Sequence, residues 1–267
     1  MKNLVFILSV IAVLVCISCG YNFKLPGSEE AIEVSVQRFD RLESRYLTTG
    51  DFSALQQMET DYPMETKTLI ENVLHIGNVE DQDINSRFLS FFQDSTLQAL
   101  IGDAESEYAN MDDINGGLTS AFINLKREIP SIEIPKVYAQ LSALDQSIII
   151  GDGTIGISLD KYMGENYQLY KKYYRSDQRN GMSRENIVPD CLSFYLLSVY
   201  PLDNFDRRSQ QERDLHTAKV MWVSNKVMKS AFFDSKYVGL IDKYMTAHKD
   251  VTTEQLLMME DCLQFME

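Results

Sequence analysis

The chain has 267 residues, 45% of them hydrophobic, and a formal net charge of −14 at pH 7. This length allows a sizeable hydrophobic core in one large domain or two small ones. The acidic balance argues against nucleic-acid binding, which needs basic patches to neutralise phosphates, and against a polybasic attachment to anionic lipid.

Residues 1–18 are predicted to be the signal peptide of a bacterial lipoprotein. A basic start precedes an apolar run from Leu4 to Val15, which is too short for a membrane-spanning helix. Cys19 follows the small residue Ser18 and resembles the lipid-bearing cysteine of a lipobox. Cys16 departs from that pattern, because leucine usually stands at this position, so a simply secreted protein with a leftover thiol stays open. Acyl chains such as palmitate on Cys19, at about 0.8 kcal/mol per buried CH₂, would anchor the mature chain to a membrane.

Residues 19–30 are predicted to form a tether, because they are polar and contain Pro26-Gly27-Ser28. The chain has no acidic run directly after Cys19, which favours a lipid anchor that faces the periplasm. Residues 31–267 are then expected to form a single, mostly helical domain.

Hydrophobic spacing in the first half of this domain predicts one short strand and several helices. Val34 and Val36 alternate as in a strand that enters a helix, and Ser53 with Gln56 resembles a capping box at the start of a second helix. Further helices are expected at residues 68–74, 85–92, 95–101 and 112–129, the last of them ended by Pro130.

The central stretch, residues 136–174, changes its hydrophobic period twice and is predicted to be a β-hairpin that leads into a helix. An alternating segment, an apolar run at 148–150 and a returning segment at 154–159 are typical of strands. Gly151-Asp152-Gly153 suits the hairpin turn, because glycine adopts positive φ at little cost.

Helices are also predicted at residues 189–200, at 209–229 and from 252 to the C-terminus. Together these elements predict an α+β fold, a mainly helical single domain with a small antiparallel β-hairpin or sheet. Cys191 and Cys262 have apolar neighbours, so free buried thiols are expected. A disulfide between them stays open, because an exported protein meets an oxidising compartment.

A group of tyrosines follows the hairpin. It comprises Tyr162, Tyr167, Tyr170, Tyr173 and Tyr174, beside Lys171, Lys172 and Arg175. This aromatic and locally basic composition suits a surface for a partner, a glycan or a small molecule. The candidate surface residues are Tyr167, Tyr170, Tyr173, Tyr174 and Arg175. Core positions with the hydroxyls at the edge of the core are the commoner role of such tyrosines and stay open as the alternative.

No catalytic residue, cofactor or metal site is predicted from the residues. A zincin metal site needs two histidines one helical turn apart and a glutamate base, whereas His75, His216 and His248 lie far apart in the sequence. Glu212 and His216 are expected to be a solvated pair on a charged helix. The chain contains no Gly-x-Ser-x-Gly motif. A hydrolase or peptidase with an unrecognised site stays open as a competing function.

Several short motifs follow one another along the chain in a recognisable order. They are the signal with Cys19, Arg38-Phe39-Asp40, Asp61-Tyr62-Pro63, Val137-Tyr138, the segment from Ile155 to Gly164, Tyr167 with Tyr170, Ile187-Val188-Pro189-Asp190, and Thr253-Glu254-Gln255. In order and spacing they resemble the motifs of the gliding-motility lipoprotein GldB family. The resemblance covers nearly the whole chain.

The resemblance implies a lipid-anchored protein of the bacterial cell envelope that acts, in gliding species, with the motility and secretion machinery. Because the residues predict no catalytic motif and no cofactor, the expected function is that of a non-enzymatic component of an envelope assembly. Its partners would be the membrane, through Cys19, and an unidentified envelope protein. The family is also distantly similar to predicted zinc peptidases, whose metal helix would correspond to residues 187–200. Because this segment has no histidine, a fold that is zincin-like in outline without the metal site is expected.

Overall fold

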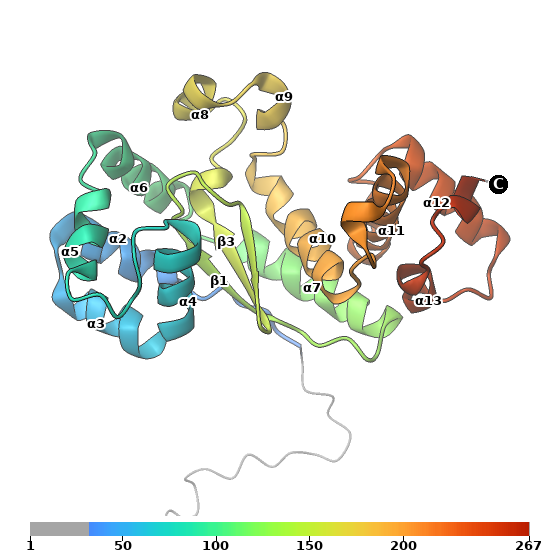
Figure 1. Cartoon of the computed structure of the whole chain (residues 1–267), viewed down its shortest axis with the longest axis horizontal. Coiled ribbons are helices and arrows are strands. Elements are labelled where there is room, and N and C mark those ends of the chain that lie inside the picture. Colours follow the sequence, from blue (N-terminus) through green and yellow to red (C-terminus); the bar gives the residue numbers. More distant parts are fainter. Residues whose placement is uncertain (1–31, 267) are drawn as a thin grey trace, which may run out of the picture. The chain divides into compact units, whose positions relative to one another are not determined.

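Helices dominate the part of the chain that the structure describes, residues 32–266 of a computed structural model (Figure 1). The predicted signal peptide, residues 1–18, and the predicted tether, residues 19–30, lie outside these residues. The described residues from Glu33 to Met266 form one compact unit. Within the described range, no helix combines the length and the apolarity needed to cross a membrane. The expected mainly helical α+β fold is confirmed.

The elements follow the predicted order. The first half contains α2 (Phe39–Thr49), α3 (Phe52–Asp61), α4 (Pro63–Lys67), the π-helical turn η1 (Thr68–Val73), α5 (Ile84–Phe91), α6 (Ser95–Glu107) and α7 (Asp112–Glu128). The second half contains α8 (Gln168–Tyr173), α9 (Ser176–Arg179), α10 (Ile187–Val199), α11 (Gln210–Met228), α12 (Lys236–Ala247) and α13 (Thr253–Met258). Short 3₁₀ turns are η2 (Leu159–Lys161), η3 (Arg184–Asn186), η4 (Phe205–Arg207) and η5 (Leu263–Met266).

Local capping explains several helix boundaries. The Asp51 carboxylate accepts a hydrogen bond from the main-chain N–H of Ser53 at 2.8 Å, so Asp51 and not Ser53 is the N-cap of α3. Gly50 ends α2 with a φ of 69°, a conformation that glycine adopts without strain. Ser209 and Glu212 form a complete capping box at the start of α11. Short polar side chains therefore decide where these helices begin.

The sheet consists of β1 (Lys136–Gln140), β2 (Ile148–Gly151) and β3 (Thr154–Ser158), in the order β1-β3-β2. β2 and β3 form the expected antiparallel hairpin, with Gly153 at a φ of 67° in its turn. β1 pairs with β3 in parallel, so the sheet as a whole is mixed. The reason is topological, because the connection over residues 141–147 is long enough to leave room for β3 between β1 and β2.

The N-terminal segment runs along β1. The strand expected at residues 34–36 is reduced to a single bridge in which Gln37 pairs with Tyr138 of β1. The main-chain N–H of Val36 donates instead to Asn115 Oδ1 of α7 at 2.9 Å. This N–H points away from β1, because the neighbouring Gln37 uses both its N–H and its C=O to bond to β1.

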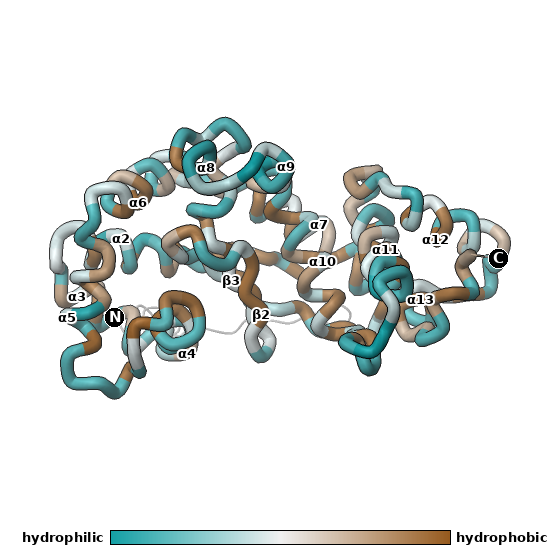
Figure 2. Tube along the Cα trace, turned by 45° about the horizontal axis from the view of Figure 1, so that its top comes forward, coloured by the Kyte–Doolittle hydropathy of each residue, from teal (hydrophilic) through white to brown (hydrophobic). Residues whose placement is uncertain are grey.

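Aromatic and apolar packing holds the helices against the sheet. Tyr138 of β1 packs over Gly156 of β3, and Phe39 of α2 meets the Tyr138 ring edge-on at a centroid distance of 6.1 Å. α10 packs against β2 and β3. Figure 2 shows that apolar residues are concentrated along these two strands and α10. The core of the domain therefore surrounds the sheet.

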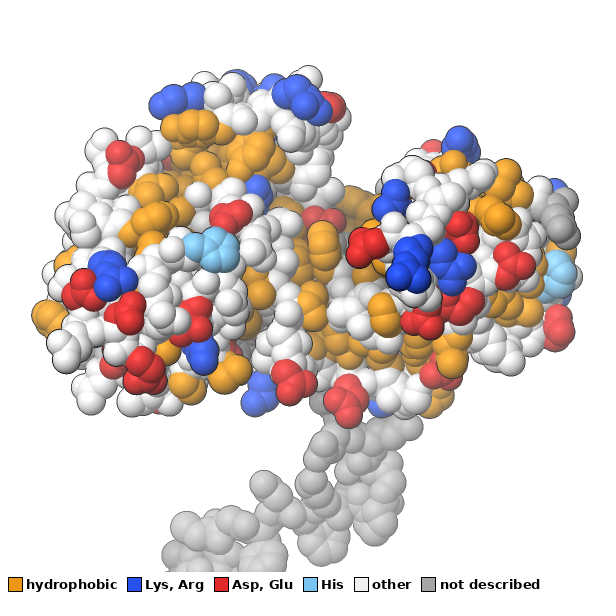
Figure 3. Space-filling view, viewed as in Figure 1, with side chains coloured by type: hydrophobic (Ala, Val, Ile, Leu, Met, Phe, Trp, Pro, Cys, Tyr) orange, Lys and Arg blue, Asp and Glu red, His pale blue; other side chains and the backbone are white. Residues whose placement is uncertain are grey.

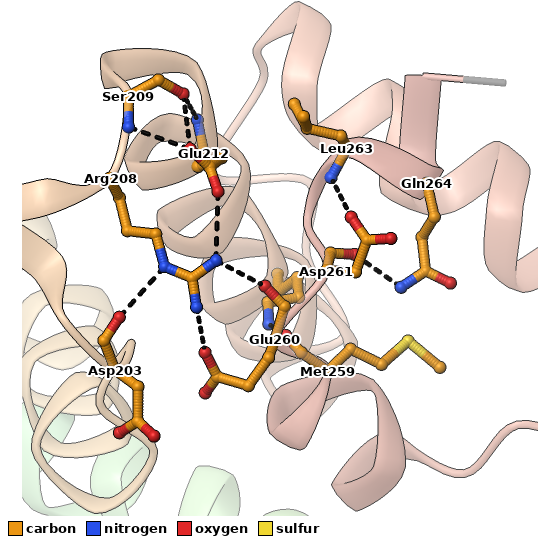
Figure 4. A network of polar contacts seen from close by, with 10 residues as sticks. Asp203, Arg208, Ser209, Glu212, Met259, Glu260, Asp261, Leu263 and Gln264 are labelled. Atoms are coloured by element: carbon orange, nitrogen blue, oxygen red, sulfur yellow. Dashed lines mark hydrogen bonds and ion pairs between the residues drawn. The ribbon is translucent and has the colours of Figure 1, made fainter.

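Two cations attach the C-terminal segment to α11. Lys219 is fully buried, and its Nζ donates a hydrogen bond to the carbonyl oxygen of Met259 at 2.5 Å. Arg208 bridges Glu212, in the first turn of α11, and Glu260, after α13 (Figure 4). These contacts place residues from the end of the chain against the start and the middle of α11.

The burial of residues near α11 tests two predictions, the one for the cysteines and the one for the pair of Glu212 and His216. Cys191 and Cys262 are free and buried, as expected. The expected solvated pair of Glu212 and His216 is wrong, because His216 is only 2% exposed. Burial, with the nearby charge of Lys219 as a second cause, lowers the pKa of His216 to about 4. Glu212 and His216 are four residues apart, a spacing typical of a solvated helix face. The prediction fails because neighbouring segments cover α11 on several sides.

Candidate functional site

Two of the short motifs from the sequence, residues 155–164 and 187–190, contact each other in the folded domain. Tyr162 follows η2 at the end of the segment that contains β3. Its Oη donates a hydrogen bond to Asp190 Oδ2 of α10 at 2.8 Å. Burial raises the pKa of Asp190 to about 6, although the hydrogen bond from Tyr162 acts in the opposite direction. Residues 155–164 and 187–190 therefore build one site.

Asp160, within η2, is a fully buried acid that holds the turn between β1 and β2. Its carboxylate accepts hydrogen bonds from the main-chain N–H groups of Ser142 at 2.9 Å and Leu144 at 2.5 Å. Ala143 and Leu144 have φ values of 52° and 69°, a region that residues with side chains rarely occupy. Burial raises the pKa of Asp160, even though these main-chain hydrogen bonds lower it. The carboxylate thus stabilises a strained turn.

Two of the candidate tyrosines hold the same turn. Tyr170 is fully buried, and its Oη donates to the carbonyl oxygen of Asp160 at 2.5 Å. Tyr174 Oη donates to the carbonyl oxygen of Leu144 at 2.8 Å and accepts a hydrogen bond from Lys161 Nζ at 3.0 Å. These hydroxyls lie at the edge of the core and bond to the main chain, which is the arrangement of the core alternative.

The solvent-exposed members of the candidate surface are Tyr173 and Arg175. Tyr173 is 57% exposed, with Lys172 Nζ at 5.0 Å from its ring centroid. Arg175 is exposed at the start of α9 and pairs with Asp177 at 2.8 Å. Figure 3 shows Lys and Arg side chains gathered over α8 and α9, at the top of the view. This end of α8 is a basic and aromatic projection on an acidic protein.

A groove of about 440 Å³ lies beside this projection. It is lined by residues 162–167 and 183–185 and by Glu107. Tyr167, half-buried in this lining, donates its hydroxyl hydrogen to Asp103 Oδ2 at 2.7 Å. Exposed carboxylates of Glu107, Glu165 and Glu185 stand around the groove. Arg184 also lines the groove but pairs with Asp113 at 2.7 Å. The three carboxylates therefore leave the groove acidic, which suits a cationic group of a ligand or partner.

Glu43 of α2 is a buried acid that sequence reasoning missed. Its Oε2 accepts a hydrogen bond from the main-chain N–H of Leu141, directly after β1, at 2.8 Å. Burial raises the pKa of Glu43 well above its ordinary value, and the charge of Asp160 raises it further. The sequence does contain a signal, because Glu43 stands on the apolar face that Phe39 and Tyr46 define at helical spacing.

Among residues 32–266, no three or more His, Cys, Asp or Glu side chains are grouped so that they could hold a metal ion. A family model described as gliding motility protein GldB matches residues 25–237, which include the groove, the sheet and all of α11. No curated protein and no solved structure matches the chain.

Proposed function

The chain belongs to the family of the gliding motility protein GldB, and from this premise we propose that it is a non-enzymatic component of a cell-envelope assembly. In this proposal, lipid on Cys19 attaches the protein to a bacterial membrane on its periplasmic side, and an envelope protein is its partner. The family match over residues 25–237 is the observation that carries the proposal.

The hydrogen bonds around the sheet support a structural role for two buried acids and two tyrosines. General acid–base and nucleophilic catalysis require a group that reaches a substrate. Glu43 and Asp160 are instead fully buried and accept main-chain N–H groups at residues 141–144. Tyr170 and Tyr174 bond to the main chain in the same region. We assign these four side chains to the stability of the fold.

The burial of Val34 and Val36 supports attachment through a short tether. Val34 and Val36 are buried, and their main-chain N–H groups donate to side chains of α7. Residues 19–33 could span at most about 50 Å if fully extended. A lipid on Cys19 would therefore keep the domain close to the membrane surface, where an envelope partner could contact it.

Cys19→Ser tests the anchor in gliding cells from which the wild-type protein has been deleted. We expect the wild type to fractionate with membranes and to restore gliding, and the variant to appear in the soluble fraction and not to restore it. Cys16→Ser is the matched control and should behave as the wild type. Membrane attachment and gliding that survive Cys19→Ser would contradict the proposal.

Asp190→Asn in the same cells tests the absence of catalysis. The asparagine side chain is isosteric with aspartate and keeps an oxygen that accepts the hydrogen bond of Tyr162. The change removes the only group in that pair able to act as an acid or base near neutral pH. A non-enzymatic protein retains gliding after this change. Loss of gliding by a variant that is at least as stable as the wild type would favour the hydrolase alternative.

A further inference from the structure

The sheet has an edge on β2 that is open within the described residues. In an antiparallel pair, successive residues alternately bond across the pair and point away from it. The main-chain N–H of Ser158 donates to the carbonyl oxygen of Ser147 at 3.0 Å, so this pair bonds across the hairpin. By the register of β2 and β3, the N–H and C=O groups of Ile148 and Ile150 then point away from β3. We call the outward side of these two residues the open edge.

The opposite edge of the sheet is closed by the N-terminal part of the domain. Gln37 donates to the carbonyl oxygen of Val137 at 2.8 Å and accepts from the N–H of Ala139 at 2.9 Å. The N–H of Leu141 donates to Glu43 Oε2 at 2.8 Å. No hydrogen bond from elsewhere in residues 32–266 reaches the open edge. Unpaired strand groups of this kind are templates for an added strand.

α10 supplies an apolar floor beside the open edge. This helix contacts β2. On α10, Tyr195 packs on Phe122 of α7, and Ser193 contacts Ser224 of α11. Successive helix residues point about 100° apart, so the side chain of Phe194 points between these two directions and faces neither α7 nor α11. Phe194 is 43% exposed. Figure 3 shows a hollow between the parts of the domain around β3 and α11, with hydrophobic side chains on its floor.

We propose that the open edge binds an extended, positively charged peptide segment of a partner protein, which adds a strand beside β2. The outward groups of Ile148 and Ile150 provide main-chain donors and acceptors for such a strand, and its apolar side chains pack on the floor of the hollow. Asp145, in the loop before β2, and Asp152, directly after β2, are exposed. Their carboxylates favour a strand that carries Lys or Arg.

The same two carboxylates argue against a second copy of this chain as the occupant. In an antiparallel pair of two β2 strands, Asp145 of one copy would approach Asp152 of the other. Each copy also has a formal net charge of −14. Like charges placed opposite one another on neighbouring strands are destabilising. The open edge is therefore protected from self-association and remains suited to a basic strand.

Fluorescence anisotropy with the mature lipidated protein in detergent tests the proposal. The probe is a labelled seven-residue peptide of alternating lysine and valine. We expect it to bind, and a peptide with the same side chains but N-methylated at alternate residues to bind at least tenfold more weakly, a loss of about 1.4 kcal/mol. A peptide of alternating glutamate and valine should not bind. Equal binding of the methylated peptide, or no binding of the basic peptide, overturns the proposal.

Ile150→Pro tests the protein side. It removes the outward N–H of Ile150, which the hairpin does not use, and proline is tolerated on edge strands with the N–H side turned outward. We expect unchanged circular dichroism and at least tenfold weaker peptide binding, whereas Ile150→Val should bind as the wild type. Full affinity of a folded Ile150→Pro overturns the proposal. If the proline variant does not fold, amide hydrogen exchange of the wild-type protein replaces this test. The bound peptide should then slow the exchange of the main-chain N–H groups of Ile148 and Ile150, and unchanged exchange rates overturn the proposal.

The inference builds on the proposed role in an assembly, because it names a kind of partner. Its test uses purified protein and a synthetic peptide, whereas the test of the proposed function uses membrane fractionation and gliding. If the peptide does not bind, the proposed membrane-anchored role is unaffected. If Cys19→Ser does not change the localisation, the proposed peptide binding at the open edge is unaffected.

Discussion

Gly156 lies under the ring of Tyr138, and the space there admits no side chain. A Cβ at Gly156 would lie 2.6 Å from Tyr138 Cζ, whereas a Cβ at Gly239 of α12 would meet nothing within 4 Å. We expect Gly156→Ala to lower the free energy of unfolding by about 1–3 kcal/mol through overpacking. Gly239→Ala, the matched control in a helix, should raise it by about 0.5–1 kcal/mol. Urea denaturation measures both, and equal effects would show that Tyr138 moves aside freely.

Asp190 should make the stability of the protein depend on pH. Because burial raises its folded-state pKa to about 6 from the ordinary value of 3.8, the folded state binds more protons than the unfolded state between these values. The contribution of Asp190 to stability is therefore complete below about pH 4 and falls as the pH rises to 6. Asp190→Asn should match the wild type at pH 4 and exceed its free energy of unfolding by about 2–3 kcal/mol at pH 7.

Urea denaturation of both proteins across this pH range checks the prediction. Asp145→Asn, at an exposed position, is the charge-matched control and should follow the wild type. A difference between wild type and Asp190→Asn that stays constant from pH 4 to pH 7 would contradict burial as the cause. At the residue scale, the sequence showed Tyr162 and Asp190 as members of two separate motifs, and only the fold brings them into contact.

At the scale of elements, Arg208 joins the start of α11 to the end of the chain. Its guanidinium contacts the carbonyl oxygen of Asp203 and the carboxylates of Glu212 and Glu260 (Figure 4). We expect Arg208→Ala to accelerate amide exchange several-fold in residues 259–266 while the sheet keeps its protection, because contacts of this segment with α11 are lost. Arg208→Lys should be intermediate, since lysine keeps the charge without the forked geometry. Uniformly faster exchange throughout the domain would contradict this local role.

Helices could be predicted more completely than strands, for a physical reason that these elements illustrate. Asp94 caps α6 next to the helix expected at residues 95–101, and Pro130 follows the end of α7. Capping and chain breaking depend on neighbouring residues, so they can be predicted locally. The direction of β1 relative to β3 depends on how the chain crosses over at residues 141–147. That connection is held by Asp160 and Glu43, which come from other parts of the chain.

At the scale of the whole molecule, the N-terminal boundary of the domain can be tested by truncation. A chain that begins at residue 32 should unfold as the mature protein does. A chain that begins at Phe39 loses the buried side chains of Val34 and Val36 and the pairing of Gln37 with β1. We expect it to be less stable by about 2–4 kcal/mol, from lost apolar burial and main-chain hydrogen bonds. Thermal and urea unfolding measure the difference, and equal stability of the two truncated chains would show that this segment is dispensable.

The sequence by itself determined the helical character of the domain, the hairpin with its Gly153 turn and the family to which the chain belongs, because periodicity, turn residues and short motifs are local properties. Tertiary structure alone decided which tyrosines are buried, which charged residues the core encloses and which edge of the sheet is open. His216 and Lys219 look like surface residues of a charged helix in the local pattern, but both are buried. Their burial results from segments distant in sequence packing over them, and no local spacing encodes that contact.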